Sequence, residues 1–206
     1  MIIVPNLTQG SAEWLATRLG VLTASQVVKL HTPTGKLSSQ RKDLVATLVA
    51  ETLLGEPVDD FQGTYWTERG TMLEDQALAY FSLQTDLEPR QVGFVYRNEN
   101  KDAGCSPDAL IYSGDDCVAG LELKCPKAGT HVGYLLDERA DKYTPQVQFS
   151  LWVTQLPAWY FMSYHVGLPP FFAKVLPDDA WQDAFETHVP DFLEEVRAAV
   201  HKLRGE

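Results

Sequence analysis

The sequence has few cysteines, no long apolar run and no overall excess of basic residues. Its three cysteines (Cys105, Cys117 and Cys125) show no CxxC spacing. This pattern indicates reduced cytosolic thiols and argues against a disulfide framework, a zinc site or an iron–sulfur cluster. No run of about 18 apolar residues occurs, and the N-terminus lacks a basic-then-apolar signal pattern. We therefore expect a cytoplasmic protein without a membrane partner.

The charge is strongly acidic and unevenly distributed. The net charge is −11 at pH 7, although proteins that bind nucleic acid usually carry a basic footprint that neutralises phosphates. Residues 1–50 hold five basic and two acidic residues, whereas the rest of the chain sums to −14. If the protein binds nucleic acid, we expect this N-terminal quarter to face it. The alternative is a solvated surface with a local excess of basic residues.

One stretch, residues 106–126 (SPDALIYSGDDCVAGLELKCP), contains two apolar segments around a polar turn. Because strand side chains alternate between faces, Glu122 and Lys124 point the same way and their apolar neighbours face the core. The turn folds the two strands together and can bring Asp108 beside Glu122. Two carboxylates and an ammonium group predict a site for metal-assisted attack on a phosphodiester. A surface ion pair between Glu122 and Lys124 is the alternative, and such pairs contribute little stability.

The order of predicted elements indicates an α/β fold. Helices come first, a mixed sheet occupies the middle, and a crossover helix, two strands and a closing helix follow. There is no internal repeat, low-complexity tract or linker, so 206 residues suit a single domain spanning 1–206 with one central sheet. The helices are expected near 12–19, from 24, 39–54, from 67, 127–136, from 144 and 178–204.

The motif and its flanks carry a family resemblance. Asp108 followed fourteen to sixteen residues later by Glu122-Leu123-Lys124 resembles the PD-(D/E)XK nuclease motif. The blocks EWLATRLGVLTASQV, GLELKCP and PQVQFSLWVT with AWYF resemble, in this order, the phage lambda-type exonuclease (YqaJ-like viral recombinase) family. The resemblance implies a PD-(D/E)XK restriction-endonuclease-like core, with a mixed central sheet flanked by helices. It also implies a metal-dependent deoxyribonuclease, a phosphodiester hydrolase.

The resemblance extends to individual active-site positions. It implies that the catalytic residues are Asp108, Glu122, Lys124, Glu74 and Gln146. The metal ligands would be Asp108, Glu122, the backbone carbonyl of Leu123, and Glu74, with Glu68 and Asp75 as nearby competitors for the last role. All-oxygen ligands suit Mg²⁺, two ions here, with Mn²⁺ as a substitute. Lys124 would either help to deprotonate the attacking water or stabilise charge on the scissile phosphate.

A second set of residues is expected to grip a DNA end. In the resembled family an arginine and two serines hold the 5′-terminal phosphate, and Arg18, Ser25 and Ser106 match those positions. Residues 23–26 also have the T-x-x-Q form of a helix capping box, and helix N-termini bind anions. A surface arginine and a helix-capping serine are the alternatives for Arg18 and Ser25.

Further DNA contacts are predicted outside the terminal-phosphate positions. Lys29, Lys36 and Arg41 of the basic region are the candidates for contacting the DNA backbone. Trp66 is a candidate for wedging between bases at the duplex end, with partial burial in the core as its alternative.

The resemblance implies a Mg²⁺-dependent 5′-to-3′ exonuclease that digests one strand of linear double-stranded DNA from 5′-phosphorylated ends. It would release mononucleotides and leave a 3′ single strand for recombination by strand annealing. Family members form a ring-shaped homotrimer and work with a phage single-strand annealing protein, so we expect a phage or prophage protein of a bacterial host. The alternatives are a structure-specific or restriction-type endonuclease on the same core and a catalytically inactive DNA-binding module.

Overall fold

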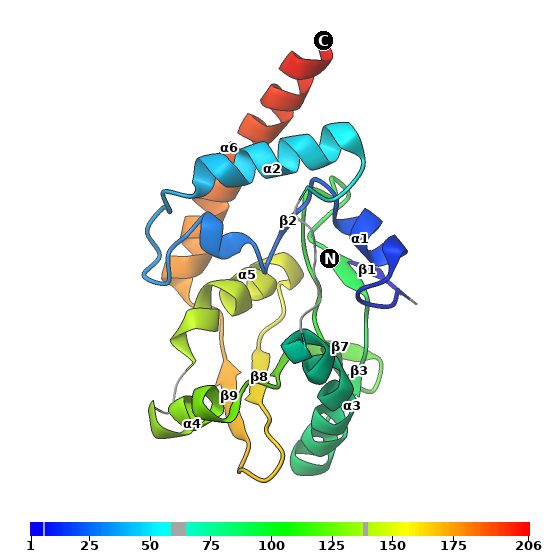
Figure 1. The fold of residues 1–206 in the computed structure, drawn as a ribbon, viewed down its shortest axis with the longest axis vertical. Coiled ribbons are helices and arrows are strands. Elements are labelled where there is room, and N and C mark those ends of the chain that lie inside the picture. The colour runs from blue at the N-terminus through cyan, green and yellow to red at the C-terminus, as the bar shows by residue number, and fades with distance from the viewer. Residues whose placement is uncertain (6, 59–64, 138–139) are drawn as a thin grey trace.

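The structure is a computed structural model that describes residues 1–5, 7–58, 65–137 and 140–206, with the backbone alone for residues 65–72. Six α-helices and two short 3-10 helices occur in these ranges, and Figure 1 shows their arrangement. The α-helices are α1 (Ala12–Arg18), α2 (Arg41–Leu54), α3 (Tyr65–Thr85), α4 (Ala128–Asp137), α5 (Thr144–Thr154) and α6 (Asp179–Arg204), and the 3-10 helices are η1 (Val27–Lys29) and η2 (Asp141–Tyr143). Within the described ranges, no helix combines the length and the apolar character needed to cross a membrane.

The strands form two mixed sheets, so the expectation of one central sheet was wrong. The smaller sheet has the order β1 (Ile2–Val4), β4 (Phe94–Tyr96), β5 (Ala103–Cys105) and β2 (Leu22–Thr23). The larger sheet has the order β3 (Glu88–Arg90), β6 (Ala109–Ser113), β7 (Asp116–Lys124), β8 (Trp159–Ser163) and β9 (Phe171–Val175). The chain passes from the smaller sheet to the larger one through residues 106–108, so this short crossing joins the two halves of the fold.

Local signals set several helix ends. Ser11 caps α1 by accepting a hydrogen bond from the Trp14 backbone N–H at 3.1 Å, and Gly55 ends α2 in the left-handed conformation. The T-x-x-Q segment differs from its prediction. Gln26 Oε1 does accept from the backbone N–H of Thr23 at 3.2 Å, but only the single 3-10 turn η1 follows instead of an α-helix.

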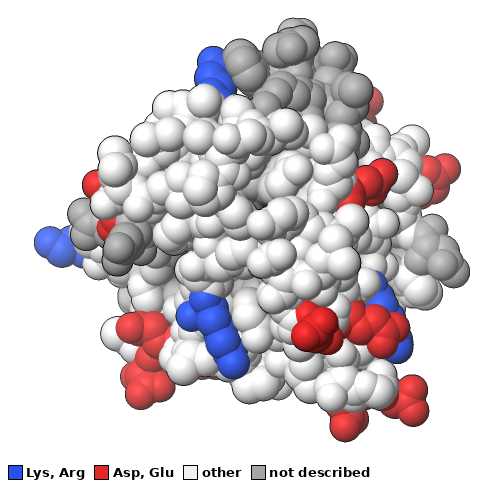
Figure 2. Space-filling view, turned by 90° about the horizontal axis from the view of Figure 1, so that it is seen from below, with Lys and Arg blue, Asp and Glu red and all other residues white. Residues whose placement is uncertain are grey.

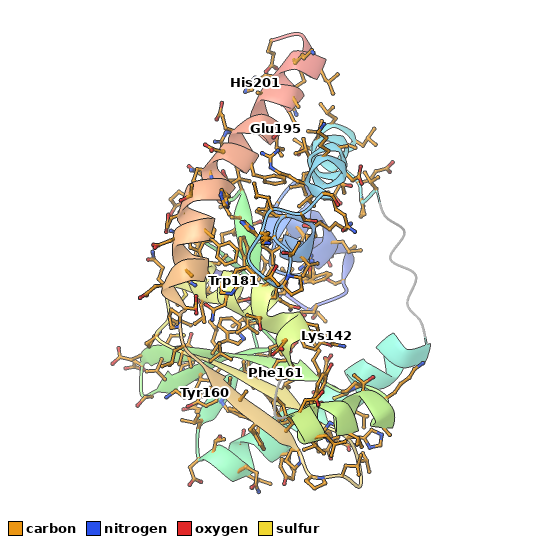
Figure 3. All side chains as sticks on the ribbon, turned by 90° about the vertical axis from the view of Figure 1, so that its left-hand side faces the viewer. Lys142, Tyr160, Phe161, Trp181, Glu195 and His201 are labelled. Carbon is orange, nitrogen blue, oxygen red and sulfur yellow. The ribbon has the colours of Figure 1, made fainter. Side chains whose placement is uncertain are left out.

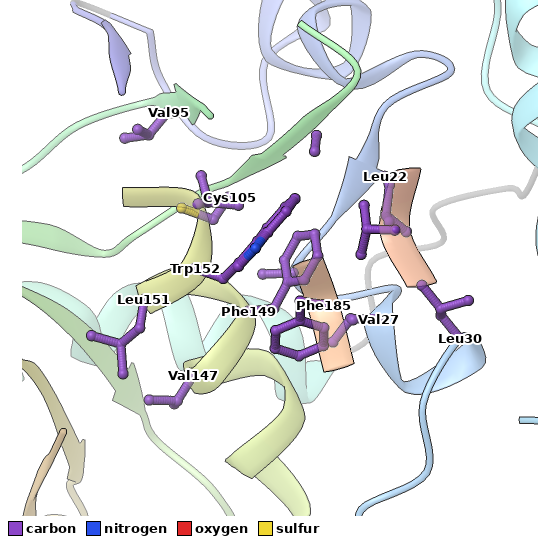
Figure 4. Close-up of a cluster of buried hydrophobic side chains, with 14 of the residues drawn as sticks. Leu22, Val27, Leu30, Val95, Cys105, Val147, Phe149, Leu151, Trp152 and Phe185 are labelled. Carbon is purple, nitrogen blue, oxygen red and sulfur yellow. The ribbon is translucent and has the colours of Figure 1, made fainter. Parts of the chain in front are cut away.

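The main hydrophobic core surrounds α5. This helix contacts both sheets and α6, and its residues 147–154 are all buried, including the polar Gln148, Ser150 and Thr154. Figure 4 shows Phe149 and Trp152 of α5 against Phe185 of α6, with Leu22 and Val27 of the N-terminal region nearby. The core thus ties the basic N-terminal quarter to α5 and α6 of the C-terminal half.

The long helix α6 closes the fold with one apolar stripe. Its buried side chains recur at helical spacing and face α2 and α5: Phe185, Val189, Phe192, Leu193, Val196 and Val200. Figure 3 shows the helix rising from the middle of the molecule to its top, from Trp181 past Glu195 to His201. Burial of each large side chain stabilises the fold by roughly 2 kcal/mol.

A second core lies between α3 and the larger sheet. Phe81 of α3 packs with Leu121 and Leu123 of β7 in this cluster. The strand fits closely on its partner β8, because a Cβ at Gly120 would overlap the ring of Trp159. Glycine is therefore required one position before the segment that carries Leu121 to Lys124.

Candidate active site

The β6–β7 hairpin brings Asp108 to the strand that carries Glu122 and Lys124. The two strands pair antiparallel with Ala109 opposite Leu121, and the backbone N–H of Asp108 donates to the Leu121 carbonyl at 3.1 Å. The Asp108 Oδ2 atom accepts from the backbone N–H of Leu123 at 2.5 Å. The predicted juxtaposition is therefore present, and the backbone of β7 fixes the Asp108 carboxylate.

Glu122 and Lys124 share the face of β7 that α5 covers. Glu122 is 3% exposed, whereas Leu121 and Leu123 face the opposite core beneath α3. Lys124 forms an ion pair with Glu122 Oε1, and Gln146 of α5 donates to the same oxygen at 2.6 Å. Gln146 therefore lies at the site as predicted, and Gln148 faces elsewhere and bonds to the Leu176 carbonyl.

The electrostatics of the cluster are those of crowded carboxylates. Burial and the charge of Glu122 raise the pKa of Asp108 to about 8. Burial alone would lower the pKa of Lys124, but Glu122 and Asp108 outweigh it and raise that pKa. Burial is also the main cause of the raised pKa of Glu74, which Asp75 and Glu122 raise further and Lys124 opposes.

Glu74 of α3 lines a pocket together with Asp108. A pocket of about 410 Å³ is lined by Glu74, Asp75, Asp108 and Leu123, together with Gln9 from the N-terminal segment. Glu74 is half-buried and Asp75 is exposed, so the Glu74 carboxylate is the one that is drawn into the site. The side chain of the third candidate, Glu68, lies outside the described side chains.

The donor set fits a hard divalent cation. Burial and the charge of Glu122 raise the pKa values of both Asp108 and Glu74, so the site has a negative potential that a bound cation relieves. In the described part of the chain, no three histidine, cysteine, aspartate or glutamate side chains lie close enough together to hold a metal ion by themselves. Water or substrate phosphate oxygens would complete the coordination shell, which is the usual arrangement for Mg²⁺.

A second polar cluster forms beside the crossing segment. Arg18 donates to Ser106 Oγ at 2.9 Å and to Ser25 Oγ at 3.2 Å, so the structure brings together the three residues predicted to hold a phosphate. Burial lowers the pKa of Arg18 to about 10, which leaves it cationic at neutral pH. The cluster has the composition of an anion site, namely a guanidinium fork and two hydroxyls.

Three of the other four predicted DNA contacts lie in the N-terminal quarter. Lys36 is exposed, Lys29 is half-buried in η1, and Arg41 forms an ion pair with Glu195 of α6 at 2.5 Å. The side chain of Trp66 lies outside the described side chains.

Figure 2 shows the end of the molecule that carries α3 and α4. On the described part of this face, acidic side chains lie around a largely uncharged centre and basic ones do not gather.

Two residues at the site were not identified from the sequence. Gln9 Nε2 donates to the carbonyl of Pro107 at 2.9 Å, directly before Asp108. The indole N–H of Trp14 donates to Ser106 Oγ at 3.1 Å. The spacing of Trp14 four positions before Arg18, on one helix face, is a signal that could have linked these two side chains, whereas nothing local marks Gln9.

Comparisons with known proteins identify the family and solved structures with a similar fold. The fold and the site define a nuclease of the PD-(D/E)XK type, a metal-dependent hydrolase. Residues 13–157 match the model of the YqaJ-like viral recombinase domain, and the chain belongs to this family.

Solved structures and a curated relative resemble the chain over different lengths. The alkaline exonuclease LHK-Exo from Laribacter hongkongensis superposes with a TM-score of 0.82 at 29% sequence identity. The match covers 94% of this chain and 96% of the LHK-Exo chain. The same enzyme in complex with dAMP gives a TM-score of 0.81. A phage-related exonuclease from Haemophilus somnus shares the fold, with a TM-score of 0.67 and 16% identity over 89% of this chain and 96% of its own. The ExoD protein of Escherichia coli (strain K12) is 30% identical over 64 residues, which are 30% of this chain and 74% of ExoD.

Proposed function

We propose that the protein is a Mg²⁺-dependent 5′-to-3′ exonuclease. It digests one strand of linear double-stranded DNA from 5′-phosphorylated ends, releases mononucleotides and leaves a 3′ single strand for recombination by annealing. One observation carries the proposal: Ser106, in contact with Arg18, and Asp108, in the carboxylate cluster, lie two residues apart in the segment that crosses between the sheets. A phosphate held by Arg18 therefore places the terminal nucleotide next to the carboxylates.

The chain's own residues divide the chemistry among them. Asp108, Glu122 and Glu74, with the Leu123 carbonyl, would hold the Mg²⁺ ions, for which Mn²⁺ can substitute. Bound there, such ions activate water and neutralise the leaving oxygen. Gln146 and Lys124 both donate to Glu122 Oε1 and so fix the orientation of this carboxylate. The ammonium group of Lys124 brings positive charge to the scissile phosphate.

Specificity comes from access to this site. The carboxylate cluster, its metal ions and Lys124 act on any phosphodiester that reaches them, so these groups do not select a DNA end. The hydroxyl and guanidinium donors of Arg18, Ser25 and Ser106 recognise a phosphomonoester, which carries more charge and more free oxygens than an internal phosphodiester. The exonuclease then advances by one nucleotide each time the new 5′-phosphate enters this pocket.

Assembly and partner follow from the family likeness. We propose a ring-shaped homotrimer that threads duplex DNA and passes the 3′ strand to a phage single-strand annealing protein. The net charge of −11 per chain would repel the released strand from the outside of such a ring. Light scattering of the purified protein tests the assembly, with three times the mass of one chain expected and the mass of one chain contradicting it.

The proposed activity is tested on three substrates in Mg²⁺: a linear duplex with 5′-phosphates, the same duplex with 5′-hydroxyls, and a closed circle. We expect rapid release of mononucleotides from the phosphorylated duplex, slow release from the hydroxyl ends and an intact circle. Lys124→Ala is the inactive control. Nicking of the circle would favour the endonuclease, and binding without any cleavage would favour the DNA-binding module.

A further inference from the structure

Trp14 contacts both Arg18 and Ser106 in the terminal-phosphate pocket, which is the set of Arg18, Ser25 and Ser106 proposed to hold the 5′-phosphate. Its indole N–H is shared between Ser106 Oγ and the carbonyl oxygen of Gly93, each at 3.1 Å. Its ring lies against the guanidinium group of Arg18, whose Cζ is 4.1 Å from the ring centroid. Trp14 therefore touches two of the three residues proposed to hold the phosphate.

The hydrogen bonds at Ser106 decide where its hydroxyl proton points. A serine hydroxyl has two acceptor lone pairs and one donor hydrogen. Ser106 Oγ accepts from Arg18 Nη1 at 2.9 Å and from the Trp14 indole N–H, so both lone pairs are used. The hydroxyl hydrogen of Ser106 is then free to donate a hydrogen bond, and it must be directed away from Arg18 and Trp14. Ser106 is thereby held as a hydrogen-bond donor, which is what a phosphate oxygen requires.

The ring of Trp14 sets the orientation of Arg18. A guanidinium stacked on an indole gains roughly 0.5–2 kcal/mol and lies flat on the ring, with its N–H groups directed outward in its own plane. The hydroxyl groups of Ser106, Ser25 and Thr23 accept hydrogen bonds from these edge groups. The stack holds the fork in the plane in which it can meet a phosphate.

A role for Trp14 in the hydrophobic core does not account for these contacts. Trp14 is half-buried and belongs to none of the buried hydrophobic clusters formed by the described residues.

We propose that Trp14 is a positioning residue, which fixes the Ser106 hydroxyl as a donor and the Arg18 guanidinium in one plane for a 5′-phosphate. This inference rests on the end specificity proposed above. Trp14 acts through these two residues and does not itself bind the phosphate.

The test measures the preference of the enzyme for phosphorylated ends, which is the ratio of kcat/KM on 5′-phosphate duplex to kcat/KM on 5′-hydroxyl duplex. Trp14→Phe keeps an aromatic face for Arg18 but loses the N–H donor, and we expect the ratio to fall roughly fivefold. Trp14→Leu also loses the stack, and we expect a fall of about thirtyfold. The Kd for the phosphorylated duplex in EDTA should rise by similar factors, while the Kd for the hydroxyl duplex stays the same.

The chain offers a matched control at Trp152. This tryptophan also stacks on an arginine, with Arg97 Cζ 3.6 Å from its ring centroid, and its N–H donates to Glu186 at 2.9 Å. Trp152→Phe removes the same kind of contact away from the pocket, and we expect the end preference to remain at its wild-type value. In a Ser106→Ala background, adding Trp14→Phe should change the ratio less than twofold, because the hydroxyl that it orients is already gone.

The outcomes separate this inference from the proposed function. If the wild-type enzyme cleaves phosphorylated and hydroxyl ends equally well, the 5′-phosphate specificity itself fails. If the wild type prefers phosphorylated ends and Trp14→Phe keeps that preference, or loses activity equally on both ends, Trp14 is only a structural residue and the inference is overturned. The Phe variant decides the matter even where Trp14→Leu fails to fold.

Discussion

Replacement of Arg18 by alanine is the sharpest perturbation of the proposed pocket. The guanidinium group links the hydroxyls of Ser106 and Ser25, at 2.9 and 3.2 Å, and lies on the ring of Trp14. Arg18 is the only charged residue among the three proposed to hold the 5′-phosphate, so the substitution removes their only charged hydrogen-bond donor. The carboxylate cluster at Asp108 and Glu122 does not hydrogen-bond to Arg18 among the described contacts and should keep its geometry.

The size of the effect follows from the hydrogen bonds lost. A hydrogen bond to a charged group contributes about 1.5–3 kcal/mol, and each 1.4 kcal/mol is a factor of ten. Loss of one such bond to the 5′-phosphate should therefore lower kcat/KM on phosphorylated ends by about 12-fold to 150-fold. On 5′-hydroxyl ends there is no phosphate to bind, so we expect a change of less than about threefold there. Arg18→Lys keeps the charge but loses the two-pronged donor geometry. Its kcat/KM on phosphorylated ends should therefore lie between the values of the wild type and of Arg18→Ala.

The assay is single-turnover release of the first nucleotide from matched duplexes, with Arg97→Ala as the control for loss of a tryptophan-stacked arginine elsewhere. Equal loss of activity on both kinds of end would refute the reasoning, because it would show that Arg18 acts on the fold or on the chemical step and not on the terminal phosphate.

Three further predictions concern catalysis and stability. Lys124→Ala should lower kcat by about 10²–10³ with the DNA affinity nearly unchanged, as measured in single-turnover cleavage and filter binding, because a charge next to the reacting phosphate is lost. His31 is buried against His188, and burial and that neighbour lower its pKa from 6.5 to about 4. The unfolded chain therefore binds more protons between these values, and urea unfolding should show stability falling by up to about 3 kcal/mol from pH 6.5 to pH 4. Gly120→Ala should destabilise the fold by roughly 1–3 kcal/mol in the same assay, since its Cβ overlaps the ring of Trp159.

Each of these predictions has its own control. Full activity of Lys124→Ala would remove lysine from the mechanism. For the pH dependence, His31→Phe should flatten the difference between pH 6.5 and pH 4, and a curve parallel to that of the wild type would contradict the assignment to His31. Gly114→Ala controls the glycine substitution, because a Cβ at Gly114 meets no atom within 4 Å and adds only the strain of its positive φ of 64°.

The sequence predicted the hairpin because its signals are local. The two-residue alternation around Glu122 places its charged and apolar side chains on opposite faces, and the polar turn at 113–116 fixes the return of the chain. In the structure, Glu122 and Lys124 lie beside Asp108 through contacts that depend only on this alternation and register. The positions of Gln146 and Arg18 came from family resemblance, since they lie on helices whose packing no local pattern specifies.

The split into two sheets was not predictable in the same way. Strand pairing between Leu22 and Ala103 or between Ile2 and Tyr96 joins segments far apart in the sequence, and periodicity gives no information on which distant strands will pair. The capping-box pattern at Thr23 forms its side-chain bond but yields one 3-10 turn, because tertiary packing of η1 against α5 overrides the local preference.

The most direct measurement is diffraction from crystals soaked in Mn²⁺, whose anomalous signal locates the ion. The account predicts a peak within coordination distance of both Asp108 and Glu122, and its loss in Asp108→Asn crystals grown in the same way. Absence of any peak between these two carboxylates in wild-type crystals, or a peak that persists unchanged in the variant, would contradict the claim that this hairpin is the metal-dependent catalytic centre.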